Sequence, residues 1–435
     1  MNFLRISGNC SLLIAKLIFY YTLFIGFFTY NFNAPVTLLY VGDLFNLILL
    51  TLCSKRIANA IKKTPLRTFT LLMLGVCVCG FFSALFNGGN IALIIWSLRN
   101  WGRAVTFFLA CCCVLNERQS SKLIVFTKNL FHINLVVIMF QYIFLREEYN
   151  QDSLNGLFGR DTSSVNTIFL MVLLCIVLSE YFTKKMKIRE LVLYLIGFNI
   201  VCALAELRGL IVFEIIFILF YALINYTGSV RQLMHYTLLI LLMLIVASIA
   251  AQYLATLYPE MVGFFSIEGI INAANNEHGY GYSGYIDRLN FYSVINDYLF
   301  KGNILNILFG IGMGNAEYST VSTFCSSFYN SYGTTFGYLR FSAPMLFLET
   351  GLIGLVMFFG AFVALLLYCI KKIRAKRING NDLLFKEIGA GILGTVILYL
   401  IYNNLQRTDV SFVIAFYAAI PFAQHQRITK VHPKN

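Results

Sequence analysis

The segment INAANNEHGYGYSGYIDRLNFYSVINDYLF, residues 271–300, lies inside a polar insert that runs from about Thr256 to Ala343. Elsewhere the chain keeps returning to apolar runs of membrane-spanning length, and here it leaves them for 88 residues. The insert has six acidic and only three basic residues, although the whole chain has a formal net charge of +13. Its many Tyr, Asn, Ser and Gly residues suit hydrogen bonding and stacking against a polar, uncharged ligand. We therefore interpret the rest of the chain as a scaffold that holds this insert over a membrane-embedded site.

The composition outside the insert is that of a helical membrane protein. Hydrophobic residues make up 59% and charged residues 12% of the chain, and the mean hydropathy is +0.74, whereas a soluble domain is about 25% charged. A soluble protein with a large core is excluded because runs of roughly 20 apolar residues recur throughout. The first run continues through Tyr30 without a cleavage site and is expected to span the membrane. The sequence predicts one all-α bundle, residues 1–435, with twelve spans at about 12–30, 36–53, 67–86, 91–115, 123–145, 162–182, 190–205, 208–225, 234–255, 344–370, 386–402 and 409–423.

The distribution of basic residues predicts the orientation of these spans. Alternate loops are rich in Lys and Arg, so they fall on one side if both termini are cytoplasmic. The polar insert, residues 256–343, then lies outside, between the ninth and tenth spans. The positive charge is mostly a signal of topology, and the chain has no nucleic-acid motif.

Nine of the 33 basic residues break this pattern, and eight of the nine are Arg. They are Arg99, Arg103, Arg146, Arg160, Arg208, Arg288, Lys301, Arg340 and Arg407. The planar guanidinium binds phosphate through two parallel hydrogen bonds, so an excess of Arg on the outer side is what a phosphate or pyrophosphate site would select.

For three of these arginines, a purely structural role is an alternative of similar weight. Arg99 and Arg103 share one helix face, where they either line a polar cavity or extend to the interface near Trp96 and Trp101. Arg208 lies at a tight outer turn, two residues after Glu206. It either pairs locally with that acid, or binds an anion with Glu206 orienting it or acting as a base.

The insert holds further candidate residues. Arg288 follows Asp287 and opens a helical-looking segment, and Arg340 lies just before the tenth span. Between them, the run LFGIGMGN, residues 308–315, has glycine at every second position, which lets a backbone turn approach a ligand or a helix closely.

His278 is either a solvated loop histidine or a base. The eleven Cys lie mostly in apolar runs, and no Cys/His spacing indicates a metal.

The order of these motifs resembles the O-antigen ligase and polymerase superfamily, and in particular Wzy-type polymerases of O-antigen or capsular polysaccharide. The matching features are Leu207-Arg208-Gly209, Arg288, Gly312-Met-Gly314-Asn315, and Arg340 followed by Glu349-Thr-Gly351-Leu-Ile-Gly354, with a weaker match at Gly156-Leu-Phe-Gly159-Arg160 and Asn166. The resemblance covers roughly Asn155 to Phe359. Ligases of the superfamily have His where this chain has Arg340, which favours a polymerase and removes the usual candidate base.

The resemblance implies a metal-independent glycosyltransferase, without a cofactor, in the bacterial inner membrane with its active site facing the periplasm. The growing glycan would move from undecaprenyl pyrophosphate to a sugar hydroxyl of the next lipid-linked repeat unit. The protein would bind that lipid-linked oligosaccharide and membrane lipid. Its candidate protein partners are a chain-length regulator and a flippase. Arg208, Arg288 and Arg340 are expected to bind the pyrophosphate, with Arg99, Arg103 and Arg160 as secondary ligands. The base would be Glu206, Asp287 or His278. Tyr280, Tyr282 and Tyr285 would form a platform for the sugar or would anchor the protein at the membrane interface.

Two other functions stay open. An O-antigen ligase would transfer finished polymer to lipid A–core. A flippase or other transporter also has about twelve spans, but such proteins usually have internal repeats and charged or broken helices at the membrane midplane, and the sequence shows neither clearly.

Overall fold

The computed structural model describes residues 2–145, 154–160, 162–205, 207–226, 228–229, 286, 288, 290–319, 321–375, 380–405, 408–423 and ten separate positions between 234 and 256. The described part contains helices and no β-strand. The longer helices are α1 (Asn2–Asn31), α2 (Val41–Ile61), α3 (Leu66–Phe86), α4 (Ile91–Val114), α5 (Glu117–Leu145), α6 (Ser163–Phe182), α7 (Ile188–Leu204), α8 (Arg208–Asn225), α14 (Ser342–Arg374), α15 (Asn381–Tyr402) and α16 (Val410–Ala418). The shorter ones in the insert are α11 (Phe291–Val294), η5 (Ile295–Phe300), α12 (Ile304–Phe309), η6 (Ser322–Phe324), α13 (Ser327–Phe336) and η7 (Tyr338–Arg340).

The predicted all-α class is confirmed, and eleven of the twelve predicted spans coincide with described helices. The ninth, at 234–255, falls mostly outside the described residues. Within the described part, seven helices are long and apolar enough to cross a membrane, namely α1, α2, α3, α5, α6, α14 and α15. The number of spans and their orientation stay predictions.

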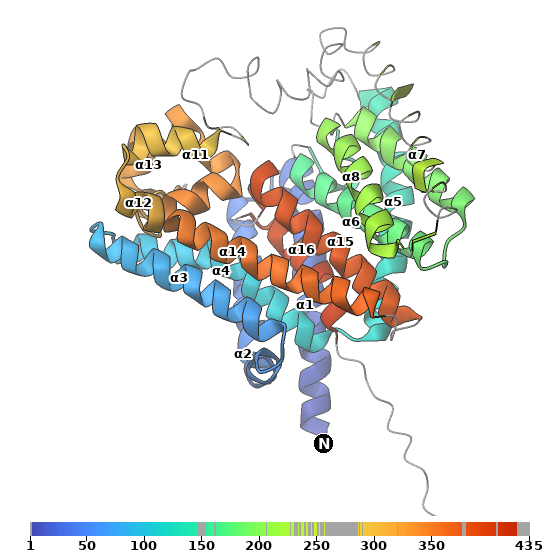
Figure 1. Ribbon diagram of the computed structural model, residues 1–435, viewed down its shortest axis with the longest axis horizontal. Coiled ribbons are helices and arrows are strands. Elements are labelled where there is room, and N and C mark those ends of the chain that lie inside the picture. Colours follow the sequence, from blue (N-terminus) through green and yellow to red (C-terminus); the bar gives the residue numbers. More distant parts are fainter. Residues whose placement is uncertain are drawn as a thin grey trace, which may run out of the picture.

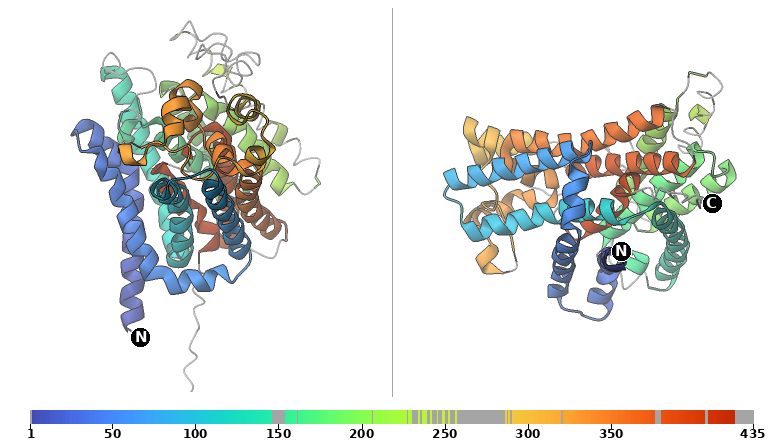
Figure 2. Two further views of the ribbon diagram at one scale, coloured as in Figure 1. Left: turned by 90° about the vertical axis from the view of Figure 1, so that its left-hand side faces the viewer. Right: turned by 90° about the horizontal axis from the view of Figure 1, so that it is seen from below.

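Helices α14 and α15 pack against each other, and α1, α2, α4 and α16 pack together beside them. At one end, α3 runs beside α14, and the short helices α11, α12 and α13 lie over the start of α14 (Figures 1 and 2). At the other end, α5, α6, α7 and α8 pack together beside α15 (Figure 1). The core lies at α6, where every residue from Val165 to Ser179 is buried, and at α15. The insert helices therefore sit on the end of the bundle at which α14 begins and α15 ends.

The outer face of α3 indicates a lipid environment. Its exposed large residues include Leu71, Leu74, Val78, Phe82 and Leu85, which recur every three or four residues along one face. A stripe of this kind on a soluble protein would be covered by a partner helix. Together with the long apolar helices, it indicates that the protein is embedded in a membrane.

Candidate functional site

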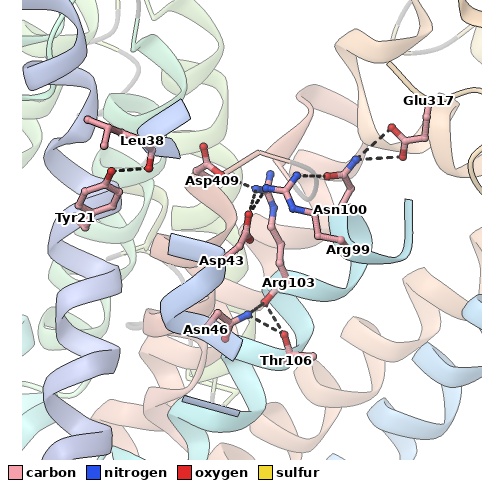
Figure 3. A network of polar contacts seen from close by, with 10 residues as sticks. All are labelled: Tyr21, Leu38, Asp43, Asn46, Arg99, Asn100, Arg103, Thr106, Glu317 and Asp409. Atoms are coloured by element: carbon pink, nitrogen blue, oxygen red, sulfur yellow. Dashed lines mark hydrogen bonds and ion pairs between the residues drawn. The ribbon is translucent and has the colours of Figure 1, made fainter. Parts of the chain in front are cut away.

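Arg99 and Arg103 on α4 point the same way, as their spacing predicts, and both meet carboxylates (Figure 3). Arg99 forms an ion pair with Asp43 of α2. Arg103 donates to Asp409 at 2.5 Å, and its Nη1 lies 3.9 Å from the Asp43 carboxylate. Asp409 directly precedes α16. Two cations and two anions from three separate segments thus form one partly buried cluster.

This cluster does not favour the predicted role of Arg99 and Arg103 as phosphate ligands. Its formal charge is zero, and Asp43 and Asp409 occupy the position that a phosphate would take. An arginine inside an apolar bundle is expensive unless it is paired, and these pairs meet that need. We therefore assign the cluster to holding α2, α4 and α16 together, and the phosphate role remains a prediction.

Other residues of α4, on sides of the helix away from Arg99 and Arg103, bind two buried acids, one in the insert and one in α14. Asn100 donates to Glu317 at 3.2 and 3.3 Å (Figure 3). Glu349 of α14 is fully buried and accepts from Ser97 at 2.9 Å and from the indole N–H of Trp101 at 2.8 Å. Its second oxygen accepts the backbone N–H of Gly314 at 2.7 Å. The two motifs that contain Gly314 and Glu349 therefore bind each other.

The glycine-rich turn fits into a break in α14. At Gly351 the backbone leaves the helical region, with φ 64° and ψ −168°. The carbonyls of Leu348 and Glu349, released by this break, accept the N–H groups of Ile311 at 2.8 Å and Gly312 at 3.1 Å. Of the two alternatives for the glycine pattern, close approach to a helix is confirmed. The contacts between the glycine-rich turn and α14 explain the glycines of both motifs without a ligand.

Glu349→Ala is expected to lower the free energy of unfolding by about 3 kcal/mol or more, because three buried donors lose a charged acceptor. Thermal unfolding of the purified protein in detergent measures the change. Glu190→Ala, at an exposed position at the start of α7, is the control and should leave the midpoint nearly unchanged. An unchanged midpoint for Glu349→Ala would contradict the assigned role of Glu349.

Arg288 lies in an environment unlike that of Arg99 and Arg103. Its guanidinium lies over the ring of Tyr402, 4.7 Å from the centroid, and over the ring of Phe341 at 5.3 Å. Its Nε is buried and has no hydrogen-bond partner. No acid in the described part of the chain pairs with it. Arg288 is thus a half-buried cation that aromatic rings hold in place and that no described carboxylate neutralises.

Tyr402 brings the predicted Arg208-Gly209 turn to Arg288. A Cβ atom at Gly209 would collide with the hydroxyl of Tyr402, so only glycine allows this approach. Arg208 is the first residue of α8, and its side chain lies outside the described part. A helix N-terminus presents unpaired N–H groups and a partial positive charge, both of which favour an anion.

Arg340 is exposed and lies in η7, on the segment that leads into α14. This segment is fastened to the residues that follow α15. Ser342 donates through its backbone N–H to the carbonyl of Asn403 at 3.1 Å, and the amide of Asn404 donates to the carbonyl of Leu339 at 2.5 Å. The guanidinium of Arg288 and the segment that carries Arg340 therefore both lie at the end of α15, where Gly209 of α8 also contacts Tyr402. We call this group of Arg208, Arg288, Arg340 and Tyr402 the arginine site.

The remaining predicted residues do not join the arginine site in the described structure. Arg160 follows a turn that is held against α5 by hydrogen bonds from Gly156 to Gln141 and from Leu157 to Asn134, both at 2.9 Å. Gly159 in the same turn approaches the backbone of α1. The other candidates, Glu206, Asp287, His278, Tyr280, Tyr282 and Tyr285, lie outside the described residues.

Sequence reasoning missed several residues that shape this region. Asp43 and Asp409 lie in apolar surroundings, and an acid in a span is itself a sign of a partner. The polar pair Asn403-Asn404 at the end of an apolar run was a similar signal. Tyr402 gave no such signal, because tyrosine is common at membrane interfaces.

Among the described residues, no three His, Cys, Asp or Glu side chains come together in a way that could hold a metal ion. No protein-family model and no curated protein matches this chain.

Proposed function

We propose that this protein polymerises lipid-linked oligosaccharide repeat units at the outer face of a bacterial inner membrane. The observation that carries the proposal is Arg288, a half-buried cation with no described acid partner, which lies over Tyr402 at the end of α15. The start of α8 and the segment that carries Arg340 contact the same end of α15. Such a place suits a polyanion at the membrane surface. The order of the motifs in the sequence supports undecaprenyl pyrophosphate as the anion and sugar transfer as the reaction.

In the proposed reaction, a sugar hydroxyl of an incoming lipid-linked unit attacks the anomeric carbon of the first sugar of the growing chain. The bond from that carbon to the pyrophosphate oxygen breaks, and undecaprenyl pyrophosphate leaves with the electron pair. Arg208, Arg288 and Arg340 stabilise the charge that develops on the leaving group. Cations held in place in a site with little water are effective because they need little reorganisation during the reaction.

The proton of the attacking hydroxyl must pass to a base. Glu206, Asp287 and His278 remain the candidates, and they lie outside the described residues. The buried acids Glu317 and Glu349 are engaged by α4 and by the glycine-rich turn, so the described contacts give them a structural role.

The test is the surface polysaccharide of a deletion strain, analysed together with its extracted lipid-linked pool. Loss of the polymer ladder, with a single repeat unit on lipid A–core or with accumulated single lipid-linked units in a capsule system, is the expected result. Long polymer on undecaprenyl pyrophosphate with bare core would identify a ligase. Single lipid-linked units trapped on the cytoplasmic side would identify a flippase and overturn the proposal.

A further inference from the structure

The stretch from Tyr318 to Leu339 has no charged residue. Its 22 residues include nine Ser or Thr and seven aromatic residues. It directly precedes Arg340, in the insert that the sequence places outside the membrane. A water-facing segment normally contains charged side chains, so this composition calls for another explanation.

Helix α13 turns part of this stretch into an ordered surface. It begins at the N-cap Ser326, whose hydroxyl accepts the N–H of Tyr329, and it ends at Gly337 in the left-handed conformation. Its exposed residues include Ser327, Asn330, Ser331 and Thr334, which share one face because they are spaced by three or four residues. Hydroxyl and amide groups both donate and accept hydrogen bonds, as sugar hydroxyls do.

Three aromatic rings lie beyond one edge of this face, where Tyr332 and Phe336 are turned about 100° or more around the helix from Ser331. Tyr332 of α13 is 39% exposed, and Tyr298 of η5 is 56% exposed. Both contact the ring of Phe336, with centroid distances of 6.1 Å and 6.0 Å. Large exposed rings of this kind stack on the apolar faces of flat ligands and offer a phenol hydroxyl at the edge. We call Tyr298, Tyr332, Phe336 and the exposed face of α13 the aromatic surface.

The aromatic surface is continuous with the arginine site. The carbonyl of Phe336 accepts the N–H of Ile286 at 2.9 Å, two residues before Arg288. In the other direction, α13 continues through Gly337 into η7, which ends at Arg340. A surface with hydrogen-bonding groups and rings, whose α13 part has no charged residue, therefore lies directly beside two arginines. A neutral glycan joined to a pyrophosphate has the same division of charge along its length.

We propose that the aromatic surface binds the neutral sugar residues of a lipid-linked oligosaccharide whose pyrophosphate lies at the arginine site. The inference rests on the proposed function and adds the place and the chemical class of the glycan portion. It assigns roles to residues 298–336 that are separate from the predicted platform of Tyr280, Tyr282 and Tyr285.

The test uses the full chain in lipid nanodiscs and two separate probes. One probe is a set of neutral, phosphate-free oligosaccharides released by mild acid from the surface polysaccharide of the producing strain. The other is inorganic pyrophosphate. Binding of the oligosaccharides is followed by saturation-transfer NMR titration. The double variant Tyr298→Ala/Tyr332→Ala is expected to bind them about 10-fold more weakly, since each ring contributes stacking and contact area.

Three further variants isolate the cause. Tyr298→Phe/Tyr332→Phe keeps the rings and should bind nearly as well as the unmodified protein. Tyr226→Ala removes a tyrosine that is 47% exposed at the end of α8, and it should change nothing. Thr335→Ala changes an exposed residue of α13 that lies between Ser331 and Tyr332 around the helix, and it should weaken oligosaccharide binding even where the double variant folds poorly. Pyrophosphate binding should be the same in all four.

Other outcomes separate the two proposals. Unchanged oligosaccharide binding by Tyr298→Ala/Tyr332→Ala and by Thr335→Ala overturns the glycan assignment. So does a protein that binds pyrophosphate and none of the neutral probes, although the arginine site then stands. Loss of membrane retention alone in the variants would show a membrane contact and would also overturn the assignment. Failure of both probes, with a normal polysaccharide ladder in the deletion strain, would remove the proposed function itself.

Discussion

Arg288→Lys should reduce polymer formation nearly as severely as Arg288→Ala, by at least about 100-fold, at a normal level of protein. A lysine keeps the charge but has neither the flat guanidinium that lies over Tyr402 and Phe341 nor the fork that binds two phosphate oxygens at once. The same loss is expected for Arg340→Lys. The measurement is complementation of the deletion strain, read as the length and amount of polymer, with membrane protein quantified in parallel.

Arg118→Lys is the matched control for these variants, because it changes an exposed arginine at the start of α5. It should restore the full ladder. A Lys variant at 288 or 340 that also restores it would show that a point charge is enough at that position, and the pyrophosphate assignment of that arginine would then be wrong.

Gly351→Ala is expected to lower the free energy of unfolding by at least about 3 kcal/mol, and to leave little folded protein in the membrane. The backbone there is in a region that only glycine adopts readily, with φ 64° and ψ −168°. An added Cβ would also collide with the backbone of Leu308 and Phe309 in α12. Thermal unfolding followed by size-exclusion chromatography measures both effects.

Gly360→Ala provides a control on the same helix. Its added Cβ would meet only a side-chain atom of Leu72 at 3.8 Å, and its backbone has an ordinary helical conformation. This variant should be neutral or slightly stabilising, because alanine favours a helix more than glycine does. Equal losses at Gly351 and Gly360 would mean that helix packing in general is at stake, rather than the break that receives the glycine-rich turn.

The helices could be predicted from the sequence because a membrane bundle requires long apolar runs, and such runs are visible without an alignment. The break at Gly351 was harder to foresee. Its cause lies 40 residues earlier in the chain, in the N–H groups of Ile311 and Gly312 that replace the interrupted helical hydrogen bonds. A local pattern of glycines does not reveal which distant backbone it will contact.

The candidate site was predictable in part. The chemistry of arginine identified Arg288, and its surroundings agree with a place for an anion. The same chemistry also selected Arg99 and Arg103, and only the fold shows that Asp43 and Asp409 meet them. Whether an arginine is available to a ligand depends on which acids come near it in space, and residue type alone does not decide this.

The rings around Arg288 have a consequence for the entropy of binding. A free arginine side chain gives up about 2 kcal/mol of rotamer freedom when it is immobilised. Tyr402 and Phe341 already restrict this side chain in the resting protein, and Gly209 leaves room for Tyr402 to do so. The rotamer entropy of Arg288 is therefore lost when the protein folds, and less of it remains to be lost each time a ligand binds. In the proposed function, one step is repeated many times on a growing chain, and this order of events would apply at every addition.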